Sequence, residues 1–362
     1  MRHQSLVRAL LRWFSRKARD LPWRRTRDPY GIWVSEIMLQ QTQVSTVVPY
    51  WERWVQELPT IESLAGCPAS KLHKLWEGLG YYSRVRNLQR AAVIIQQQHG
   101  GQFPKRFEEI MGLPGIGRYT AGAICSIAYN EPVPAVDGNL VRVLARIFAV
   151  SGDPRQKSTN DCLWNLAQEL VQTAAASRNT SVPNCSFLNQ SLMELGAVIC
   201  TPRNPQCRNC PVVKFCAAYK QKRVEELPTP AARQPIAQRI YAAFVIEHGN
   251  RFLAWQRPSG TINAHLWEFP NIEIKNSNAR TAAKQLFGDS TESLGRIMVI
   301  KHSITRYRIT LQVFGARLSK PIPQSPPTSR WLNRTELDQL AFVAAHRKII
   351  QRLILAEAPG AR

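Results

Sequence analysis

The chain has no long apolar run and few acidic residues. No stretch approaches the ~20 consecutive apolar residues that a membrane-spanning helix needs, which argues against a membrane-spanning protein. Only 25 Asp and Glu residues stand against 48 Lys and Arg residues, so the 362-residue chain carries a formal net charge of +23. Such an excess of positive charge attracts polyanions, of which DNA and RNA are the commonest.

A secretory leader, an internal repeat and low-complexity segments are also missing. Residues 1–19 are Arg-rich and contain no acid, as in a mitochondrial transit peptide. However, Leu6, Leu10 and Phe14 recur at helical spacing, so we expect a first helix of the mature protein. Disulfides are not expected without secretion, and the sequence therefore predicts a reducing compartment, the cytoplasm and nucleoid of a bacterium.

The length favours two domains. Apolar residues recur every three or four positions up to about residue 198, which predicts a helical domain at 1–220. A polar, proline-bearing stretch at 221–235 is typical of a linker. The remainder, 236–362, has an α+β pattern, with strands expected at 240–247, 251–256, 297–303, 309–317 and 329–332 and helices at 279–287 and 334–356.

Four cysteines lie within the segment 200–216, spaced C-x6-C-x2-C-x5-C: Cys200, Cys207, Cys210 and Cys216. Four thiolates from one short loop suit a cubane iron–sulfur cluster. Structural zinc also takes four cysteines, but usually as two C-x2-C pairs that are farther apart. Zinc and a chance grouping of buried cysteines remain alternatives to the cluster.

A glycine-containing turn between two expected helices has the sequence Leu-Pro-Gly-Ile-Gly at 113–117. Gly115 and Gly117 allow a tight turn and a close approach of another backbone. The exposed amides of the next helix can hold a phosphate, with Arg118 beside them. The turn therefore predicts a contact with the DNA backbone that does not depend on base sequence, although an ordinary helix–turn–helix corner has similar features.

Together these motifs resemble a known family. LPGIGRYT at 113–120, VDGN at 136–139, the cysteine spacing and the segments 33–42 and 76–88 are similar to those of the helix-hairpin-helix DNA glycosylases, and among these the adenine DNA glycosylases of the MutY type. The resemblance is close over 5–225 and looser over 236–355. It implies an all-α catalytic region with a [4Fe-4S] loop and a Nudix-like α+β domain. It also implies a monomer that binds duplex DNA containing adenine opposite 8-oxoguanine or guanine.

Hydrolysis of an N-glycosidic bond needs a proton for the leaving base and an anion for the sugar cation. Glu36 lies among apolar residues, where the pKa of a carboxyl group rises, and the resemblance implies that it is the general acid. Asp137 precedes an expected helix, where a carboxylate can stay ionised; it is either a simple N-cap or, as the resemblance implies, the anion. Tyr119 stands where related lyases carry a lysine. Because a tyrosine cannot form a Schiff base, it favours a monofunctional enzyme over an endonuclease III-like lyase.

The resemblance implies further roles at the substrate. Trp23, Arg24, Leu39 and Gln190 match positions of the adenine pocket, and Gln41 and Tyr82 match residues that enter the base stack. In the second domain the stretch 276–288 lacks a carboxylate-rich Nudix signature, so this domain is expected to bind and not to hydrolyse. Thr305 and Arg306 occupy the expected lesion-reading loop, which departs from the family pattern and could instead be a basic hairpin. A non-catalytic iron–sulfur DNA-binding protein is the alternative of a different class.

Overall fold

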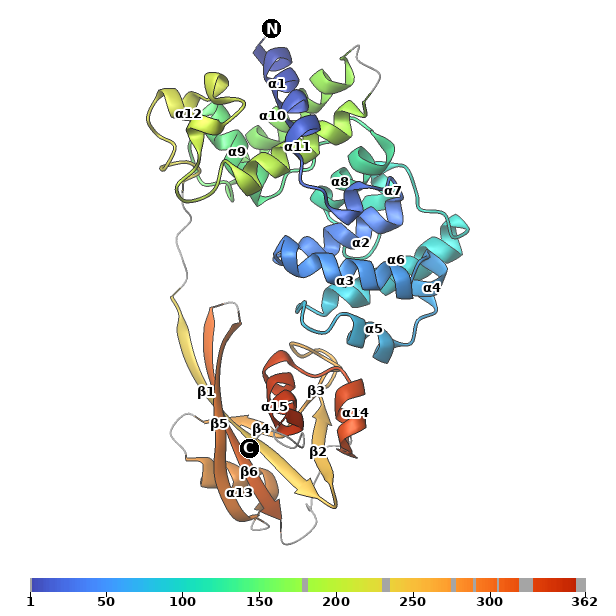
Figure 1. The fold of residues 1–362 in the computed structure, drawn as a ribbon, viewed down its shortest axis with the longest axis vertical. Coiled ribbons are helices and arrows are strands. Elements are labelled where there is room, and N and C mark those ends of the chain that lie inside the picture. Colours follow the sequence, from blue (N-terminus) through green and yellow to red (C-terminus); the bar gives the residue numbers. More distant parts are fainter. Residues whose placement is uncertain are drawn as a thin grey trace. The chain divides into compact units, whose positions relative to one another are not determined.

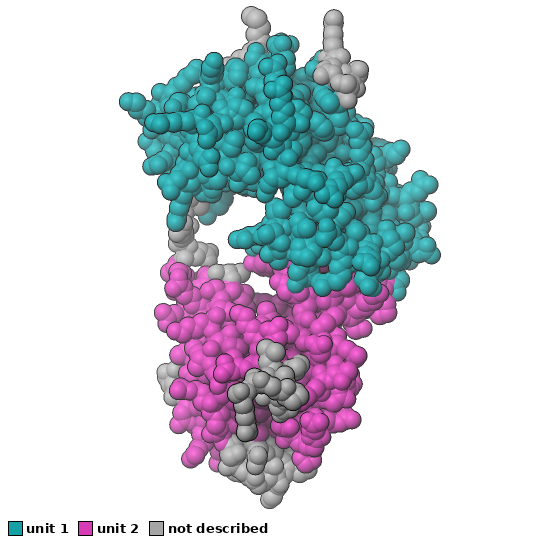
Figure 2. Space-filling model, in the orientation of Figure 1, with its two compact units in different colours: residues 1–66, 86–232 teal, residues 67–85, 233–362 magenta. Residues whose placement is uncertain are grey.

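The computed structural model describes residues 2–177, 182–229, 235–274, 278–288, 291–304, 306–318 and 328–355. The chain forms two compact units (Figure 2). The first comprises residues 1–66 and 86–232, and the second comprises 67–85 and 233–362. The second unit thus includes a segment taken from within the helical half of the sequence. The predicted boundaries at 220 and 236 stay predictions.

The first unit is helical, as the periodicity predicts (Figure 1). One core is built where helices α1, α9, α10 and α11 pack together, with Leu6, Leu140 and Leu192 at most 1% exposed. The apolar side of α1 faces this core, which confirms the first helix. The helices up to residue 220 are α1 (Arg2–Lys17), η1 (Pro22–Arg24), α2 (Pro29–Leu39), α3 (Val44–Glu57), α4 (Ile61–Ala65), α5 (Ala69–Leu75), α6 (Ser83–His99), α7 (Phe107–Met111), α8 (Arg118–Tyr129), α9 (Gly138–Phe148), α10 (Lys157–Ala175), α11 (Asn184–Val198), η2 (Cys207–Asn209), η3 (Val213–Phe215) and α12 (Ala217–Lys220).

Helix α2 is buried along almost its whole length. The carboxylate of Asp28 caps its start by accepting hydrogen bonds from the amides of Tyr30 and Gly31. The indole of Trp51 on α3 donates to the Gly31 carbonyl oxygen at 2.8 Å, which fixes α2 against α3. Nine of the eleven residues of α2 are buried, and they include its single acid, Glu36.

The glycine turn joins α7 to α8. Gly115 has φ +79°, and a Cβ there would come within 2.7 Å of Asn87 Cβ on α6, so this position requires glycine. On α8, a Cβ at Gly122 would lie 2.1 Å from the Pro134 carbonyl oxygen. This close approach brings the segment before α9 against α8. The starts of both helices are thereby held in one region, with Tyr119 at one and Asp137 at the other.

The second unit is built on one mixed sheet, with strand order β3-β2-β1-β6-β5, to which β4 and β7 add at β1 and β2. Strand β1 runs parallel to β6, and the other pairs are antiparallel. Alternate residues of β1 enter two cores, so helix α13 covers one face and α15 the other (Figure 1). The strands are β1 (Ala237–His248), β2 (Arg251–Gln256), β3 (Trp267–Glu268), β4 (Asn271–Glu273), β5 (Thr291–Ile304), β6 (Tyr307–Leu318) and β7 (Ser329–Leu332).

All five expected strands are present, and α13 (Ala279–Phe287) has the predicted bounds. The short strands β3 and β4 were not expected, because two or three residues carry no readable period. The helix expected at 334–356 is wrong in one respect: it is two helices, α14 (Arg334–Gln339) and α15 (Ala344–Leu355). The chain between the two helices is extended. There the backbone amide of Trp267 donates to the Ala341 carbonyl oxygen, and the backbone carbonyl oxygen of Trp267 accepts from the Val343 amide.

Candidate active site

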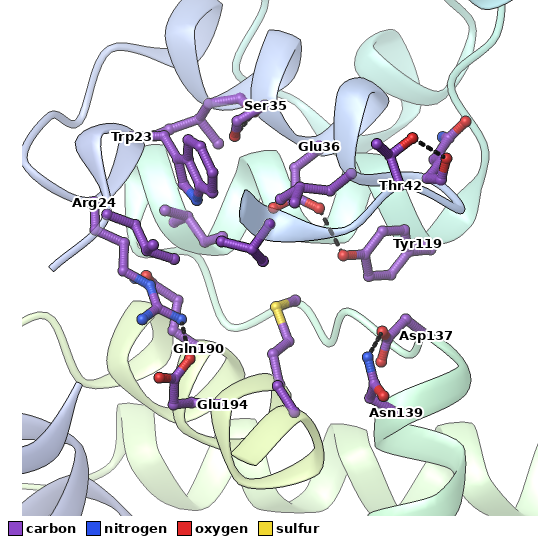
Figure 3. A pocket seen from close by; sticks show the side chains of 18 of the residues that line it. Trp23, Arg24, Ser35, Glu36, Thr42, Tyr119, Asp137, Asn139, Gln190 and Glu194 are labelled. Atoms are coloured by element: carbon purple, nitrogen blue, oxygen red, sulfur yellow. Dashed lines mark hydrogen bonds and ion pairs between the residues drawn. The ribbon is translucent and has the colours of Figure 1, made fainter. Parts of the chain in front are cut away.

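A cavity of about 760 Å³ opens in the first unit, between α2, the first turns of α8 and α9, and α11 (Figure 3). Its volume is in the range of small-molecule pockets. Polar groups line it from five separate segments of the sequence. Of the sequence-predicted residues, those lining the cavity are Trp23, Arg24, Glu36, Leu39, Gln41, Tyr119, Asp137 and Gln190.

Glu36 is 5% exposed, in the wall that α2 contributes. Burial raises the pKa of this carboxyl to about 7; the hydrogen bond from Tyr119 opposes the rise, and the nearby Asp137 adds to it. The group can therefore hold a proton near neutral pH and release it to a base bound in the cavity. This agrees with the pKa expected from the apolar sequence around it.

Asp137 is the N-cap of α9. One carboxylate oxygen accepts from the Leu140 amide at 2.7 Å and the other from the Asn139 side-chain amide at 2.9 Å. Burial raises the pKa of Asp137, while these two donors act in the opposite direction. Arg142 donates to the Asn139 side chain at 2.8 Å and to the Cys200 carbonyl at 2.7 Å. Asp137 is thus both the N-cap of α9 and a carboxylate held in fixed orientation in the cavity.

Tyr119 follows the first residue of α8, and its hydroxyl donates to Glu36 Oε2 at 2.6 Å (Figure 3). Burial raises its pKa far above the ordinary value, with the charges of Glu36 and Asp137 adding to the rise. The phenol therefore stays protonated and acts as a hydrogen-bond donor. A donor at this distance orients the Glu36 carboxyl group within the cavity.

One wall of the cavity is aromatic and apolar. Trp23 is 6% exposed, and its ring meets Trp51 edge to face at 6.1 Å. Leu39, the last residue of α2, also lines the cavity. Gln190 on α11 is 8% exposed and donates its amide to Ser186 Oγ at 3.0 Å, which leaves its carbonyl oxygen to accept. An apolar wall with one oriented amide suits a flat heteroaromatic base.

Glu194, for which the sequence predicted no role, also lines the cavity and is 1% exposed. Its carboxylate accepts from Arg19 at 2.6 Å and from Arg24 at 2.9 Å. These hydrogen bonds lower the pKa of Glu194 although burial acts against them. The sequence contains a signal for this residue: Glu194 is an acid among apolar residues of α11, as Glu36 is on α2.

The two residues predicted to enter the base stack have different surroundings. Gln41 is exposed, with φ +59°, directly after α2. Tyr82 is 5% exposed and packs edge to face on His73 at 5.8 Å. Its neighbour Tyr81 is 48% exposed, with φ +48°. A buried ring cannot enter a base stack unless it leaves the core, so this placement favours Tyr81 over Tyr82.

The glycine turn leaves the first amides of α8 without intrahelical partners, at the N-cap Gly117. Arg118 is exposed, and its guanidinium stacks on the Trp164 ring at 3.8 Å from the centroid. Gly115 lies at the tip of the turn and is exposed. These groups are outside the cavity, on a surface where a phosphate could be bound by amides and a cation together.

The four predicted cysteines line one small, largely apolar cavity beside α9. Arg146 donates to Cys200 Sγ at 3.4 Å. Burial raises the pKa of Cys210 to about 12, with the other three sulfurs adding to the rise. Among the described residues, no three His, Cys, Asp or Glu side chains converge closely enough to hold one ion. Four thiols around one cavity are the donor set that a cubane iron–sulfur cluster takes.

In the second unit, the predicted lesion-reading residue Thr305 lies outside the described residues. Arg306 is exposed and donates to the Tyr307 hydroxyl at 3.1 Å. Helix α13, which stands where a Nudix hydrolase would carry its metal-binding acids, contains no Asp or Glu. No helix in the described part of the chain has the length and apolar character to cross a membrane.

Comparisons with known proteins match most of this chain. Residues 34–169 match the HhH-GPD superfamily base excision DNA repair proteins, and residues 241–352 match the NUDIX domain. The chain is 35% identical to the human adenine DNA glycosylase over 97% of this chain and 74% of the relative. It is 36% identical to the adenine DNA glycosylase of Buchnera aphidicola subsp. Acyrthosiphon pisum over 74% of each. Among solved structures, a thermostable thymine-DNA glycosylase matches with a TM-score of 0.54 and 30% identity, over 61% of this chain and 97% of that one.

Proposed function

This chain belongs to the adenine DNA glycosylases of the HhH-GPD superfamily, and on that premise we propose that it removes adenine from duplex DNA where adenine faces 8-oxoguanine or guanine. The observation that carries the proposal is that two carboxyl groups, the buried Glu36 and the partly exposed Asp137, line one cavity with an apolar wall. A base inside a duplex cannot reach such a cavity, so the adenine must first be flipped out of the stack.

Glu36 is the general acid. Its pKa of about 7 allows the protonated form at neutral pH, and the Tyr119 hydroxyl orients it. Protonation of the adenine ring makes it a better leaving group, and the glycosidic bond then breaks with positive charge on the sugar. Asp137, fixed by the Leu140 amide, stabilises that charge as an anion. Water is the final nucleophile, because no amine is provided by Tyr119 and the enzyme is monofunctional.

Recognition of the flipped adenine rests on Trp23, Leu39 and Gln190, with Arg24 held by Glu194. The vacated place in the stack is filled by Gln41 and by a tyrosine. We assign that tyrosine as Tyr81, because its ring is exposed whereas that of Tyr82 is buried.

The remaining parts hold the DNA. Cys200, Cys207, Cys210 and Cys216 bind a [4Fe-4S] cluster, which fastens a basic loop near phosphate and supplies no chemistry to the hydrolysis. The second unit binds the oxidised guanine through the segment that contains Thr305 and Arg306, and it does not hydrolyse nucleotides, since α13 lacks acids. We expect the enzyme to act as a monomer.

The test is incubation with a duplex that contains adenine opposite 8-oxoguanine, followed by hot alkali. We expect strand breaks only after alkali, because an abasic site without lyase action leaves the strand intact. Breaks before alkali would indicate a lyase, and no breaks in either sample would indicate a binding protein. A duplex with adenine opposite thymine is the control and should stay intact.

A further inference from the structure

Glu77 makes an unusually complete set of contacts within the second unit. It follows α5 and precedes the loop of residues 78–82. One of its carboxylate oxygens accepts from Arg347 Nε at 2.8 Å and from the Phe342 amide at 2.9 Å. The other accepts from Lys74 Nζ at 2.8 Å. The Glu77 side chain is only 14% exposed, so these charge-assisted bonds are formed largely out of water.

Arg347, on α15, is the counterpart of Glu77 and is 12% exposed. Besides Glu77, its guanidinium donates to the carbonyl oxygens of Leu337 within α14 and Leu340 after it. It also donates to the carbonyl and carboxylate oxygens of Asp338, each at 3.4 Å. Each nitrogen of the planar guanidinium group therefore donates to an acceptor. The pair therefore fixes residue 77 to α15 and to the segment that links α14 to α15. Removal of one partner would leave the other charge buried and uncompensated.

The loop after Glu77 has a constrained backbone. Gly78, Gly80 and Tyr81 have φ of +104°, +70° and +48°. The carbonyl oxygen of Gly80 accepts from Trp76 Nε1 at 3.0 Å and from Arg84 at 3.1 Å. A left-handed conformation is unfavourable for a tyrosine, so its surroundings must hold it. Tyr81 is nevertheless 48% exposed, which means that a strained backbone presents an aromatic ring to solvent.

Other contacts join the same segment to the rest of the second unit. The His73 ring on α5 stacks on His265 with centroids 6.3 Å apart, and Lys74 donates to the Asp338 carbonyl oxygen. Residues 67–85 therefore lie within the helical half of the sequence but pack with the residues of the second unit. The loop that carries Tyr81 is fixed on its first side by Glu77 and on its last side by Arg84.

We propose that the Glu77–Arg347 pair is a positioning device that lets the lesion-binding unit hold Tyr81 in the conformation required to enter the base stack. This rests on the function proposed above, in which Tyr81 replaces the flipped adenine. Glu77 and Arg347 do not touch the reacting atoms; they act through the loop. Loss of the pair should therefore impair unstacking of the target base and leave the chemistry of Glu36 unchanged.

The experiment uses the full chain with Glu77→Gln, Arg347→Met and Arg347→Lys. Arg330→Met is the matched control, because Arg330 lies in the same unit, is 56% exposed and pairs with Glu336 on the surface. Unstacking is measured as the fluorescence rise of 2-aminopurine placed opposite 8-oxoguanine when the protein binds. Single-turnover adenine release is measured from pH 5 to pH 9. Amide hydrogen exchange of residues 77–82 and a melting curve complete the set.

For Glu77→Gln and Arg347→Met we expect about tenfold slower single-turnover adenine release, a smaller fluorescence rise and faster amide exchange in 77–82. The pH profile should keep its shape. Arg347→Lys, which keeps the charge, should retain at least a third of the wild-type rate, and Arg330→Met should stay within twofold. In a Tyr81→Ala background, adding Glu77→Gln should change the rate by less than twofold, because residues that act as a unit are not additive.

Two results would overturn the proposal. One is a rate of adenine release within twofold of wild type for both Glu77→Gln and Arg347→Met. The other is a loss of rate in Glu77→Gln that adds in full to the loss caused by Tyr81→Ala. The second would mean that the pair serves the fold and not Tyr81. A wild-type chain that releases no adenine would instead reject the proposed function. The exchange of 77–82 would still decide in that case whether the pair holds the loop.

Discussion

The raised pKa of Glu36 has a consequence for stability that does not depend on DNA. In the folded chain the carboxyl keeps its proton up to a pKa of about 7, against an ordinary value of 4.5. Between these values the folded state binds more protons than the unfolded state, so the free energy of unfolding falls as the pH rises. The whole loss, present above about pH 7, is on the order of 3 kcal/mol. Glu36→Gln does not titrate and keeps an oxygen for the Tyr119 hydroxyl.

We therefore expect Glu36→Gln to match wild type in stability near pH 4.5 and to exceed it by about 3 kcal/mol at pH 8. Urea unfolding of both proteins at several pH values measures this difference. Glu225→Gln is the matched control, because Glu225 is exposed and the same chemical change there should have little effect at either pH. A stability difference that does not change between pH 4.5 and pH 8 would refute the burial argument for Glu36.

Three further predictions follow from the site. Wild type should not be trapped on DNA by borohydride as a major product, whereas Tyr119→Lys should gain some trapping and strand nicking; strong wild-type trapping would contradict the monofunctional assignment. The anaerobically purified protein should contain about four irons per chain, and Cys210→Ser should lose iron and DNA affinity more than the intrinsic cleavage step; one zinc and no iron would contradict the cluster. Thr305→Ala should lower the binding free energy by about 1–2 kcal/mol for 8-oxoguanine substrates and by little for guanine substrates. Arg306→Ala should weaken binding of both substrates alike and lower the slope of log affinity against log salt by about one. Equal losses on both substrates for Thr305→Ala would mean that the lesion-reading site lies elsewhere.

The parts of the fold that the sequence predicted are those with a long, regular period. The helical character of the first unit and the longer strands of the second belong to this group. The helix break at 340–343 could not be predicted, because its cause is tertiary: Trp267, distant in sequence, supplies hydrogen bonds to this extended segment. The same holds for residues 67–85, whose helical pattern gives no sign that they group with the second unit.

The site was predictable where a residue contrasts with its neighbours. Glu36 is an acid in an apolar helix, and the same contrast marks Glu194, which was overlooked because no motif drew attention to it. The choice between Tyr81 and Tyr82 could not be made from two adjacent tyrosines, since only the backbone decides which ring is buried. The catalytic and binding roles themselves stay predictions until they are measured.

The central claim is that two carboxyl groups perform the cleavage. It is tested most directly by single-turnover adenine release from a duplex with adenine opposite 8-oxoguanine, measured for wild type, Glu36→Gln and Asp137→Asn beside a titration of duplex binding. We predict that each substitution abolishes release while the dissociation constant changes little, because phosphate contacts and the flipped base supply most of the affinity. Release by either variant within about tenfold of wild type, a loss of only ~1.4 kcal/mol, would contradict the claim for that residue.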